Sequence, residues 1–261
     1  MAQLPVRPIP PLPENLMLLV EVGSTAHGTG LPGHEDHDEI GIVVEYPHEV
    51  FGLSGGFHSR MQRTQPEGTR SGPLDTDRTL HSLRKFLHLA ATGNPSILMC
   101  FWAPVIRSTS LGDDLRGLAP AFLGRHVIPK YRGYMKQQGE RMLGIRGRSG
   151  HGRRGGGQRT ELIEAHGYDT KFAMHCARLG FQGVELVTTG ELQLPIQGEP
   201  ADWLRAVRHG QVPFQEWWDR CLELDAELEA LLTDQRYRAE PDRKAIVNWS
   251  IDAHQSAWST L

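Results

Sequence analysis

The first third of the chain alternates between short apolar runs and polar or glycine-rich turns. Residues 16–22 and 39–45 are two such runs with turn signals between them, which predicts buried strands. Residues 58–64 indicate a further strand. Residues 74–81 alternate with a period of two, so we expect a strand there with one polar face.

From residue 82 onwards the apolar positions recur at helical spacing. Ser82 is a suitable N-cap for a helix with an apolar stripe between Leu83 and Ala90. The tripeptide Gly-Asn-Pro at residues 93–95 ends this helix, and its proline suits the first turn of another. Longer helices are expected at about residues 114–143, 160–180, 200–208, 214–235 and 240–256.

These patterns predict an α/β (α+β) protein with two parts. After an extended proline-rich lead-in at residues 1–14, a small mixed sheet is expected over residues 15–112 and a helical domain over residues 113–261. Residues 146–159 interrupt the helical part with five arginines, six glycines and no acid. We expect this segment to be flexible without a partner, because glycine adds backbone entropy that no apolar burial offsets.

Composition and charge narrow the class of protein. Charged residues make up 23 % of the chain and the net charge is −3, so overall charge does not favour a polyanion binder. Three widely spaced cysteines allow no disulfide framework or zinc spacing by themselves. The apolar runs are far too short to span a membrane, and the proline-rich start lacks the apolar centre of a signal peptide. We therefore expect a cytoplasmic protein with no membrane partner.

The most informative motif joins the first two predicted strands. Gly23 and Ser24 follow the first strand, and Asp36 and Asp38 stand where the second begins. Two carboxylates at positions i and i+2 of an extended segment point to the same face. Carboxylate oxygens suit Mg²⁺, which takes further ligands from substrate phosphates, and a glycine-serine turn can cradle those phosphates. The motif indicates metal-assisted phosphoryl or nucleotidyl transfer.

In this motif and four others, the chain resembles the DNA polymerase β-like nucleotidyltransferase superfamily, in particular its compact bacterial and phage branch. The resemblance extends over most of residues 16 to 245. Its five blocks occur here in the order that the family shows, at residues 23–29, 36–41, 83–87, 93–95 and 167–175.

The resemblance implies an enzyme that moves a nucleoside monophosphate from an NTP to a hydroxyl acceptor and releases pyrophosphate. It implies two Mg²⁺ (or Mn²⁺) ions held by three acids. Asp36 and Asp38 would hold the ion that grips the triphosphate, and Asp38 with Asp77 the ion that activates the acceptor. The family pattern places its third acid at Asp77, and Asp75, on the same predicted face, is the alternative.

Nucleotide contacts are implied for Gly23 and Ser24 at the phosphates, and for Lys171 and His175 on a predicted helix. Lys171, His175 and Arg178 follow one another at i, i+4 and i+7 and so share one helical face. Such a polar face is more often simply solvated surface. Arg84 is a further candidate for the nucleotide.

Other interpretations stay open at this point. The arginine–glycine segment from Arg146 to Arg159 is suited to RNA phosphates, to a lid over a nucleotide or to a solvated linker. Imidazole and carboxylate groups between His34 and Asp38 also fit a zinc hydrolase, although alternate residues face opposite ways. The same acids could serve a phosphohydrolase or nuclease, and the fold could serve a non-catalytic RNA-binding module. The acceptor can be an RNA end, a small molecule or a protein side chain.

Overall fold

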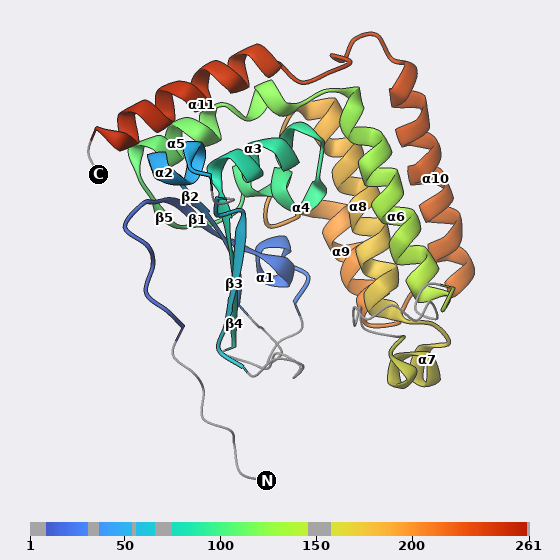
Figure 1. Ribbon diagram of the computed structural model, residues 1–261. Coiled ribbons are helices and arrows are strands. Elements are labelled where there is room, and N and C mark those ends of the chain that lie inside the picture. The colour runs from blue at the N-terminus through green and yellow to red at the C-terminus, as the bar shows by residue number, and fades with distance from the viewer. Residues whose placement is uncertain (1–8, 31–36, 54–55, 66–74, 146–157, 260–261) are drawn as a thin grey trace, which may run out of the picture. The chain divides into compact units, whose positions relative to one another are not determined.

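The computed structural model describes residues 9–30, 37–53, 56–65, 75–145 and 158–259 (Figure 1). These residues form two compact units. Unit 1 comprises the described parts of Met1–Thr92, Ser96–Phe122 and Pro241–Leu261, and unit 2 those of Gly93–Pro95 and Leu123–Glu240. The division differs from the ranges that the sequence suggested, because the last described residues return to unit 1.

In the part of the chain that the structure describes, unit 1 is built on a five-stranded sheet with the order β3-β4-β2-β1-β5. Its strands are β1 (Leu16–Val22), β2 (His37–Val43), β3 (Ser59–Arg63), β4 (Thr76–Ser82) and β5 (Val105–Ser108). Strands β2 and β4 are parallel, whereas the other neighbours are antiparallel. This mixed sheet and the helices around it confirm the predicted α+β class.

The helical elements of unit 1 are α1 (Gly23–His27), α2 (Pro47–Phe51), α3 (Leu83–Ala91), η1 (Met99–Phe101), α5 (Ser110–Gly117), η2 (Ala119–Phe122) and α11 (Arg243–Trp258), and α4 (Pro95–Leu98) spans a boundary between the units. Among them, α1, α3, α5 and η1 pack against the sheet, and α11 packs on α3 and η2. Ser82 caps α3 as expected, since its side chain accepts a hydrogen bond from the backbone N–H of Lys85.

Both faces of the sheet carry apolar side chains. On one face Leu16, Leu19, Val43 and Leu80 form a buried cluster covered by Leu12 and Phe57. Gly41 lies within this cluster, where a larger residue would overlap Leu80. On the other face, Gly112 of α5 lies so close to β1 that a Cβ there would stand 3.3 Å from the Cβ of Leu18.

Unit 2 is a group of helices arranged around α8. It consists of η3 (Arg125–Val127), α6 (Ile128–Met142), α7 (Thr160–His166), α8 (Thr170–Thr189), α9 (Gly198–Arg208) and α10 (Phe214–Thr233) (Figure 1). Two glycines let the neighbouring helices approach α8 closely. A Cβ at Gly180 would lie 2.9 Å from Leu224 of α10, and one at Gly183 would lie 3.0 Å from Tyr131 of α6.

The prediction of one helix over residues 114–143 was wrong. The chain instead forms α5, two 3₁₀ turns and α6, because Pro120 and Pro129 have no N–H for an internal helical hydrogen bond and are tolerated only in a first turn. The predicted helix over residues 160–180 is also two helices. Gly167 separates them with a φ of +83°, a conformation that glycine adopts at little cost.

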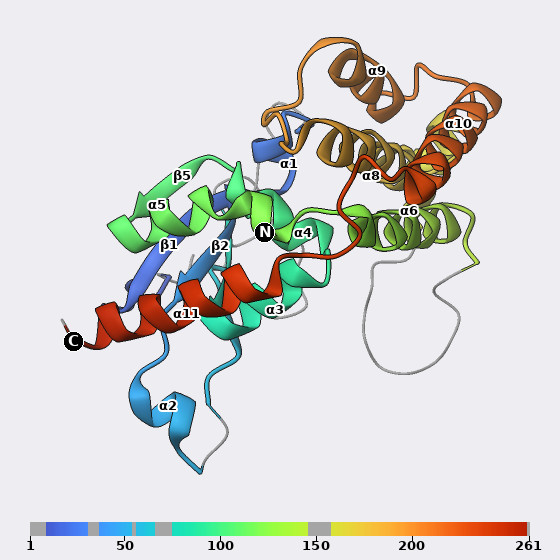
Figure 2. The same cartoon turned by 90° about the horizontal axis from the view of Figure 1, so that it is seen from above.

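A buried ion-pair cluster joins α11 to the end of β2. Glu45 is fully buried, and its Oε1 lies 3.0 Å from Nε of Arg84. Its Oε2 lies 3.3 Å from Nε2 of His254. The indole N–H of Trp258 donates to the backbone oxygen of Glu45 over 2.7 Å. Figure 2 shows α11 lying along α3.

The cluster shifts the pKa of both titratable partners. Burial raises the pKa of Glu45, but hydrogen bonds from His254 and Arg84 outweigh it and bring that pKa from 4.5 to about 2. Burial lowers the pKa of His254, but its hydrogen bonds with Glu45 and the Ser250 carbonyl outweigh it and raise that pKa above 6.5. Glu45 therefore contributes stability above pH 4.5 that is lost towards pH 2. His254 contributes stability below pH 6.5 that is lost as the pH rises through its folded pKa.

We predict that Glu45→Gln lowers the free energy of unfolding by about 3 kcal/mol, because it leaves the buried imidazolium of His254 without its carboxylate partner. The difference from the unsubstituted protein should be largest between pH 4.5 and 6.5, where both Glu45 and His254 are charged. Urea unfolding between pH 3 and 9 measures it. Asp252→Asn, at an exposed position of α11, should change stability by less than about 0.5 kcal/mol. Equal losses in both variants would contradict the assignment.

Candidate active site

Two of the predicted acids lie side by side on neighbouring parallel strands. Asp38 of β2 is the register partner of Asp77 of β4. Neighbouring strands are about 4.8 Å apart, and register partners in a parallel pair project from the same face of the sheet. Asp36 lies outside the described residues, so the meeting of all three acids stays a prediction.

The same register places two further residues in line with these acids. On the far side of Asp77, its antiparallel partner is Arg63 of β3, and on the far side of Asp38 it is Val22 of β1. These four register partners, one from each of four neighbouring strands, are Arg63, Asp77, Asp38 and Val22, and we call them the acidic row. The row ends at Val22, where β1 leads into α1.

Gly23 adjoins the acidic row at the start of α1. The sequence suggested an open glycine-serine turn, but the chain forms one short helix from Gly23 to His27. Gly23 has a φ of +72°, and a Cβ there would overlap Oδ2 of Asp38. Glycine is thus required both by the backbone conformation and by the close approach of the carboxylate.

Asp77 is held by two side chains of the β3 region. Arg63 Nη2 lies 2.9 Å from its Oδ2, and Gln65 Nε2 donates to its Oδ1 over 3.0 Å. Asp75 has a different partner, since Thr64 Oγ1 donates to its Oδ1 over 2.9 Å. The register makes Asp77 the described acid directly beside Asp38, whereas Asp75 precedes β4.

These groups are suited to a hard cation. An ionised carboxylate offers about four lone-pair sites and has no donor of its own. Two adjacent carboxylates repel one another unless a cation lies between or beside them. Arg63 supplies one such charge. Oxygen donors of this kind fit Mg²⁺ or Mn²⁺ better than softer metals.

The short helix also carries polar groups that suit a ligand. The hydroxyl oxygens of Thr25 and Thr29 are buried and have no hydrogen-bond partner among the described residues. The first N–H groups of any helix lack intrahelical acceptors. Ser24 lies among these groups, partly exposed, at the first turn of α1.

His81 extends the same face of β4 beyond Asp77. Its Nδ1 lies 2.7 Å from the hydroxyl of Ser59, and it is the register partner of Ile42. Burial, and then the charge of Lys85, lower the pKa of His81 below 6.5. The imidazole is therefore neutral near pH 7 and does not add to the positive charge of Arg63.

Arg84 lies at the other end of β4. It follows Ser82, whereas Asp77 stands near the start of the strand. At about 3.3 Å per residue, the five steps of strand from Asp77 to Ser82 cover roughly 16 Å. Arg84 pairs with the buried Glu45, so the structure gives it a structural partner rather than a place beside Asp38.

The remaining predicted contacts belong to unit 2. Lys171 and His175 lie on the first turns of α8, both partly exposed. Most of the arginine–glycine segment, residues 146–157, is outside the described residues. Arg159 is described and begins α7 as its N-cap, with its backbone N–H 2.8 Å from Oδ2 of Asp169.

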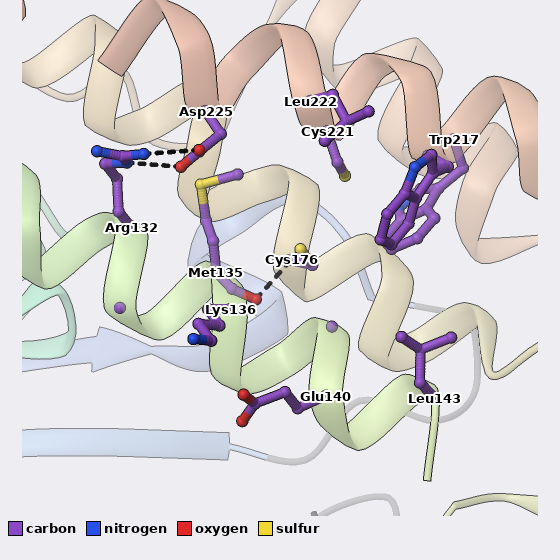
Figure 3. A pocket seen from close by; sticks show the side chains of 13 residues that line it. Arg132, Met135, Lys136, Glu140, Leu143, Cys176, Trp217, Cys221, Leu222 and Asp225 are labelled. Carbon is purple, nitrogen blue, oxygen red and sulfur yellow. Dashed lines mark hydrogen bonds and ion pairs between the residues drawn. The ribbon is translucent and has the colours of Figure 1, made fainter. Parts of the chain in front are cut away.

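A separate cavity of about 430 Å³ opens in unit 2 between α6, α8 and α10 (Figure 3). Its lining is mainly apolar and includes Met135, Trp217 and Leu222, with the ion pair of Arg132 and Asp225 at one end. It contains none of the residues that the sequence singled out as a site.

Neither a metal cluster nor a membrane helix emerges from the described residues. Among them, no three His, Cys, Asp or Glu side chains come together as metal ligands; Asp36 and His34, which two of the hypotheses need, are outside that set. Nor does any helix in the described ranges have the length and apolar character to cross a bilayer.

The site residues that the sequence did not reveal come from strand pairing. Arg63 and Gln65 lie in or just after β3, a strand that the pattern predicted, but only the register with β4 brings them to Asp77. An arginine in a polar strand is usually solvated. The only available signal was its position opposite a strand with an acidic face.

The family model that matches most of the chain shows a nucleotidyltransferase-like protein of the DNA polymerase β type, as the resemblance implied. The chain belongs to the RlaP family, the RNA repair pathway DNA polymerase beta family, whose model matches residues 11–252. A search of curated proteins finds no match. Among solved structures, this chain is similar to a nucleotidyltransferase-like protein from Exiguobacterium sibiricum 255-15. The match covers 95 % of this chain and 75 % of that protein's chain, at 10 % sequence identity and a TM-score of 0.28.

We predict that Gly23→Ala destabilises the protein by more than the 1–2 kcal/mol or so that a left-handed backbone alone costs an alanine. The extra loss arises because the new Cβ overlaps the Asp38 carboxylate. Gly190→Ala is the matched control, since Gly190 has a φ of +80° and open space around it. Chemical unfolding of both variants measures the difference. In an Asp38→Ala background the excess cost of Gly23→Ala should shrink; an unchanged excess would show that the close approach is not its cause.

Proposed function

We propose that this protein transfers a nucleoside monophosphate from an NTP to a hydroxyl acceptor and releases pyrophosphate. The observation that carries the proposal is the register of Asp38 with Asp77, beside a glycine that touches Asp38. Membership of a nucleotidyltransferase-like family supports the same class of reaction. The enzyme would be a transferase of phosphorus-containing groups.

Two Mg²⁺ or Mn²⁺ ions are the proposed cofactors. Asp38 and Asp77 would hold one of them, and Asp36 with Asp38 the other. When bound, the ions would neutralise the triphosphate and lower the pKa of the acceptor hydroxyl. The carboxylate oxygens of this set are the ligand type that such ions prefer.

The chain's own groups would orient the substrate. Gly23 and Ser24 would contact the β- and γ-phosphates through backbone N–H groups and the serine hydroxyl. Holding the phosphates there aligns the α-phosphorus for in-line attack. The acceptor oxygen forms a bond to that phosphorus while the bond to pyrophosphate breaks, and the hydroxyl proton passes to water.

We propose an RNA end as the acceptor. The support is the description of the family, which names an RNA repair pathway. An RNA end offers hydroxyl groups that can act as the nucleophile. The base preference of the NTP does not follow from the acidic row, which addresses only phosphates.

We predict that Asp38→Asn and Asp77→Asn each reduce metal-dependent pyrophosphate release by about 100-fold or more, because a lost ligand removes several kcal/mol of transition-state stabilisation. Asp75→Asn should keep most of the activity, since the carboxylate of Asp75 is bonded to Thr64 rather than beside Asp38. The assay supplies each NTP with RNA and follows both pyrophosphate and the lengthened RNA. Circular dichroism checks that the variants fold.

Three outcomes would redirect this proposal. Full activity in both asparagine variants would overturn the role of the acidic row. A loss in Asp75→Asn with normal Asp77→Asn would move the third acid to Asp75. Release of nucleoside monophosphate or shortened RNA without an adduct would instead indicate a phosphohydrolase or nuclease, and metal-independent RNA binding without turnover a non-catalytic module.

A further inference from the structure

The face of the sheet that carries the acidic row continues along β3 and β4. Figure 1 shows these two strands side by side, and their register pairs Met61 with Thr79 and Ser59 with His81. Each of the four residues stands two or four positions along its strand from the acidic row. Because alternate residues of a strand project from the same face, the two pairs share the face of the row. We call Met61, Thr79, Ser59 and His81 the β3–β4 strip.

The β3–β4 strip is open to solvent, whereas the opposite face of the same strands is covered. Met61 keeps 64 % of its surface exposed, and Ser59 is exposed as well. The alternate positions Gln62, Arg78 and Leu80 are buried. A single exposed methionine is ordinary at a protein surface, so it is the position of Met61, next to carboxylates suited to metal ions, that is informative.

On the neighbouring strand β2 the same face is closed. Ile40 and Ile42 are the register partners of Thr79 and His81, and both isoleucines are buried. Among the described residues, a substrate that extends along this face from Asp77 therefore lies over β3 and β4.

The order of groups along the acidic row indicates which substrate lies there. Gly23 and Ser24, the proposed phosphate contacts, stand at the β1 end of the row, and Arg63 stands at the β3 end. In phosphoryl transfer the attacking and leaving oxygens are roughly in line, on opposite sides of the phosphorus. With pyrophosphate leaving towards β1, the acceptor hydroxyl arrives from the side of β3 and β4.

The pair of Ser59 and His81 is suited to binding a further hydroxyl group. The hydroxyl of Ser59 lies 2.7 Å from Nδ1 of His81. A hydroxyl has one hydrogen to donate and two lone pairs to accept, and a neutral imidazole has one donor and one acceptor nitrogen. The pair can therefore exchange hydrogen bonds with a ribose. The 2′-hydroxyl of the ribose is the group by which a protein distinguishes RNA from DNA.

Met61 offers a different kind of contact. Its thioether is flexible and polarisable and makes favourable contacts with aromatic rings, such as those of nucleobases. Along the strands, Met61 lies about 7 Å from the acidic row and Ser59 about 13 Å. A nucleoside joined to the reacting hydroxyl therefore passes Met61 first, and its neighbour in the nucleic-acid strand reaches Ser59.

We propose that the β3–β4 strip holds the single-stranded end of an RNA acceptor, with Met61 against a base and the pair of Ser59 and His81 at a ribose 2′-hydroxyl. This inference rests on the proposed function and names the residues that select its acceptor. They are specificity-determining rather than catalytic residues, because they lie away from the acids that surround the reacting phosphorus. They also differ from the proposed NTP contacts, which lie at the opposite end of the acidic row.

The test measures binding of a short single-stranded RNA, and of DNA with the same sequence, to the full-length protein by fluorescence anisotropy without NTP. We predict that RNA binds more tightly than DNA. Met61→Ala should weaken binding of both by about fivefold, and Ser59→Ala should weaken binding of RNA alone by about fivefold, because it removes a hydrogen bond to the 2′-hydroxyl. Ser59→Thr keeps a hydroxyl and should keep the preference. Ile251→Ala, a control at a 51 % exposed position of α11, should change neither affinity.

Transfer assays separate this proposal from the proposed function. Met61→Ala should raise the KM for RNA and leave the KM for the NTP unchanged. If no transfer occurs but Ser59→Ala still removes a preference for RNA, the strip keeps its role and the transfer reaction is wrong. Equal binding of RNA and DNA, equal effects of Met61→Ala and Ile251→Ala, or a raised KM for the NTP alone would overturn the strip and leave the transfer reaction in place.

Discussion

The parallel pairing of β2 with β4 is the constraint on which the candidate active site depends. Parallel partners in register project from one face, so this single pairing places Asp38 next to Asp77 although the chain makes a long excursion between them. The antiparallel neighbours then add Arg63 on one side and the end of β1 on the other. The two carboxylates can lie close together because the positive charge of Arg63 offsets part of their mutual repulsion.

The same two strands serve a different purpose at their other end. There, Glu45 follows β2 and Arg84 follows β4, and His254 from α11 completes a cluster in which Glu45 and His254 are buried and Arg84 is exposed. Both clusters pair acids with arginine, but their surroundings differ. Glu45 is fully buried, whereas the side chain of Asp77 keeps 17 % of its surface exposed. The buried carboxylate of Glu45 is suited to stabilising the fold, and the accessible carboxylate of Asp77 is suited to binding a ligand.

Local patterns predicted much of unit 1. The apolar run of β1 has the bounds expected, and the alternation before Ser82 correctly put Asp77 and Arg78 on opposite faces, of which that of Arg78 is buried. Short elements were missed. Strand β5 has no apolar alternation because its residues are mostly exposed, and α1 is a single turn without a helical period to detect.

Contacts between distant residues were beyond the sequence. Arg84 was assigned to the nucleotide because nothing local shows that Glu45 is buried beside it. The partners of Asp77 depend on the register of β3, which a strand pattern leaves undetermined. Within unit 2, the spacing along α8 indicated a polar face, but nothing in the sequence indicated the hydrogen bond from Tyr168 to the Val212 carbonyl, which ties the loop after α9 to the start of α8.

Unit 1 is discontinuous along the chain, since α11 follows the whole of unit 2. During synthesis at roughly 5–20 residues per second, the strands of unit 1 are therefore made several seconds before α11. Throughout that interval Glu45 lacks the imidazole of His254 and the indole of Trp258. The Glu45 cluster can thus be completed only after unit 2 has been translated, and a chain stalled after residue 240 would contain neither partner from α11.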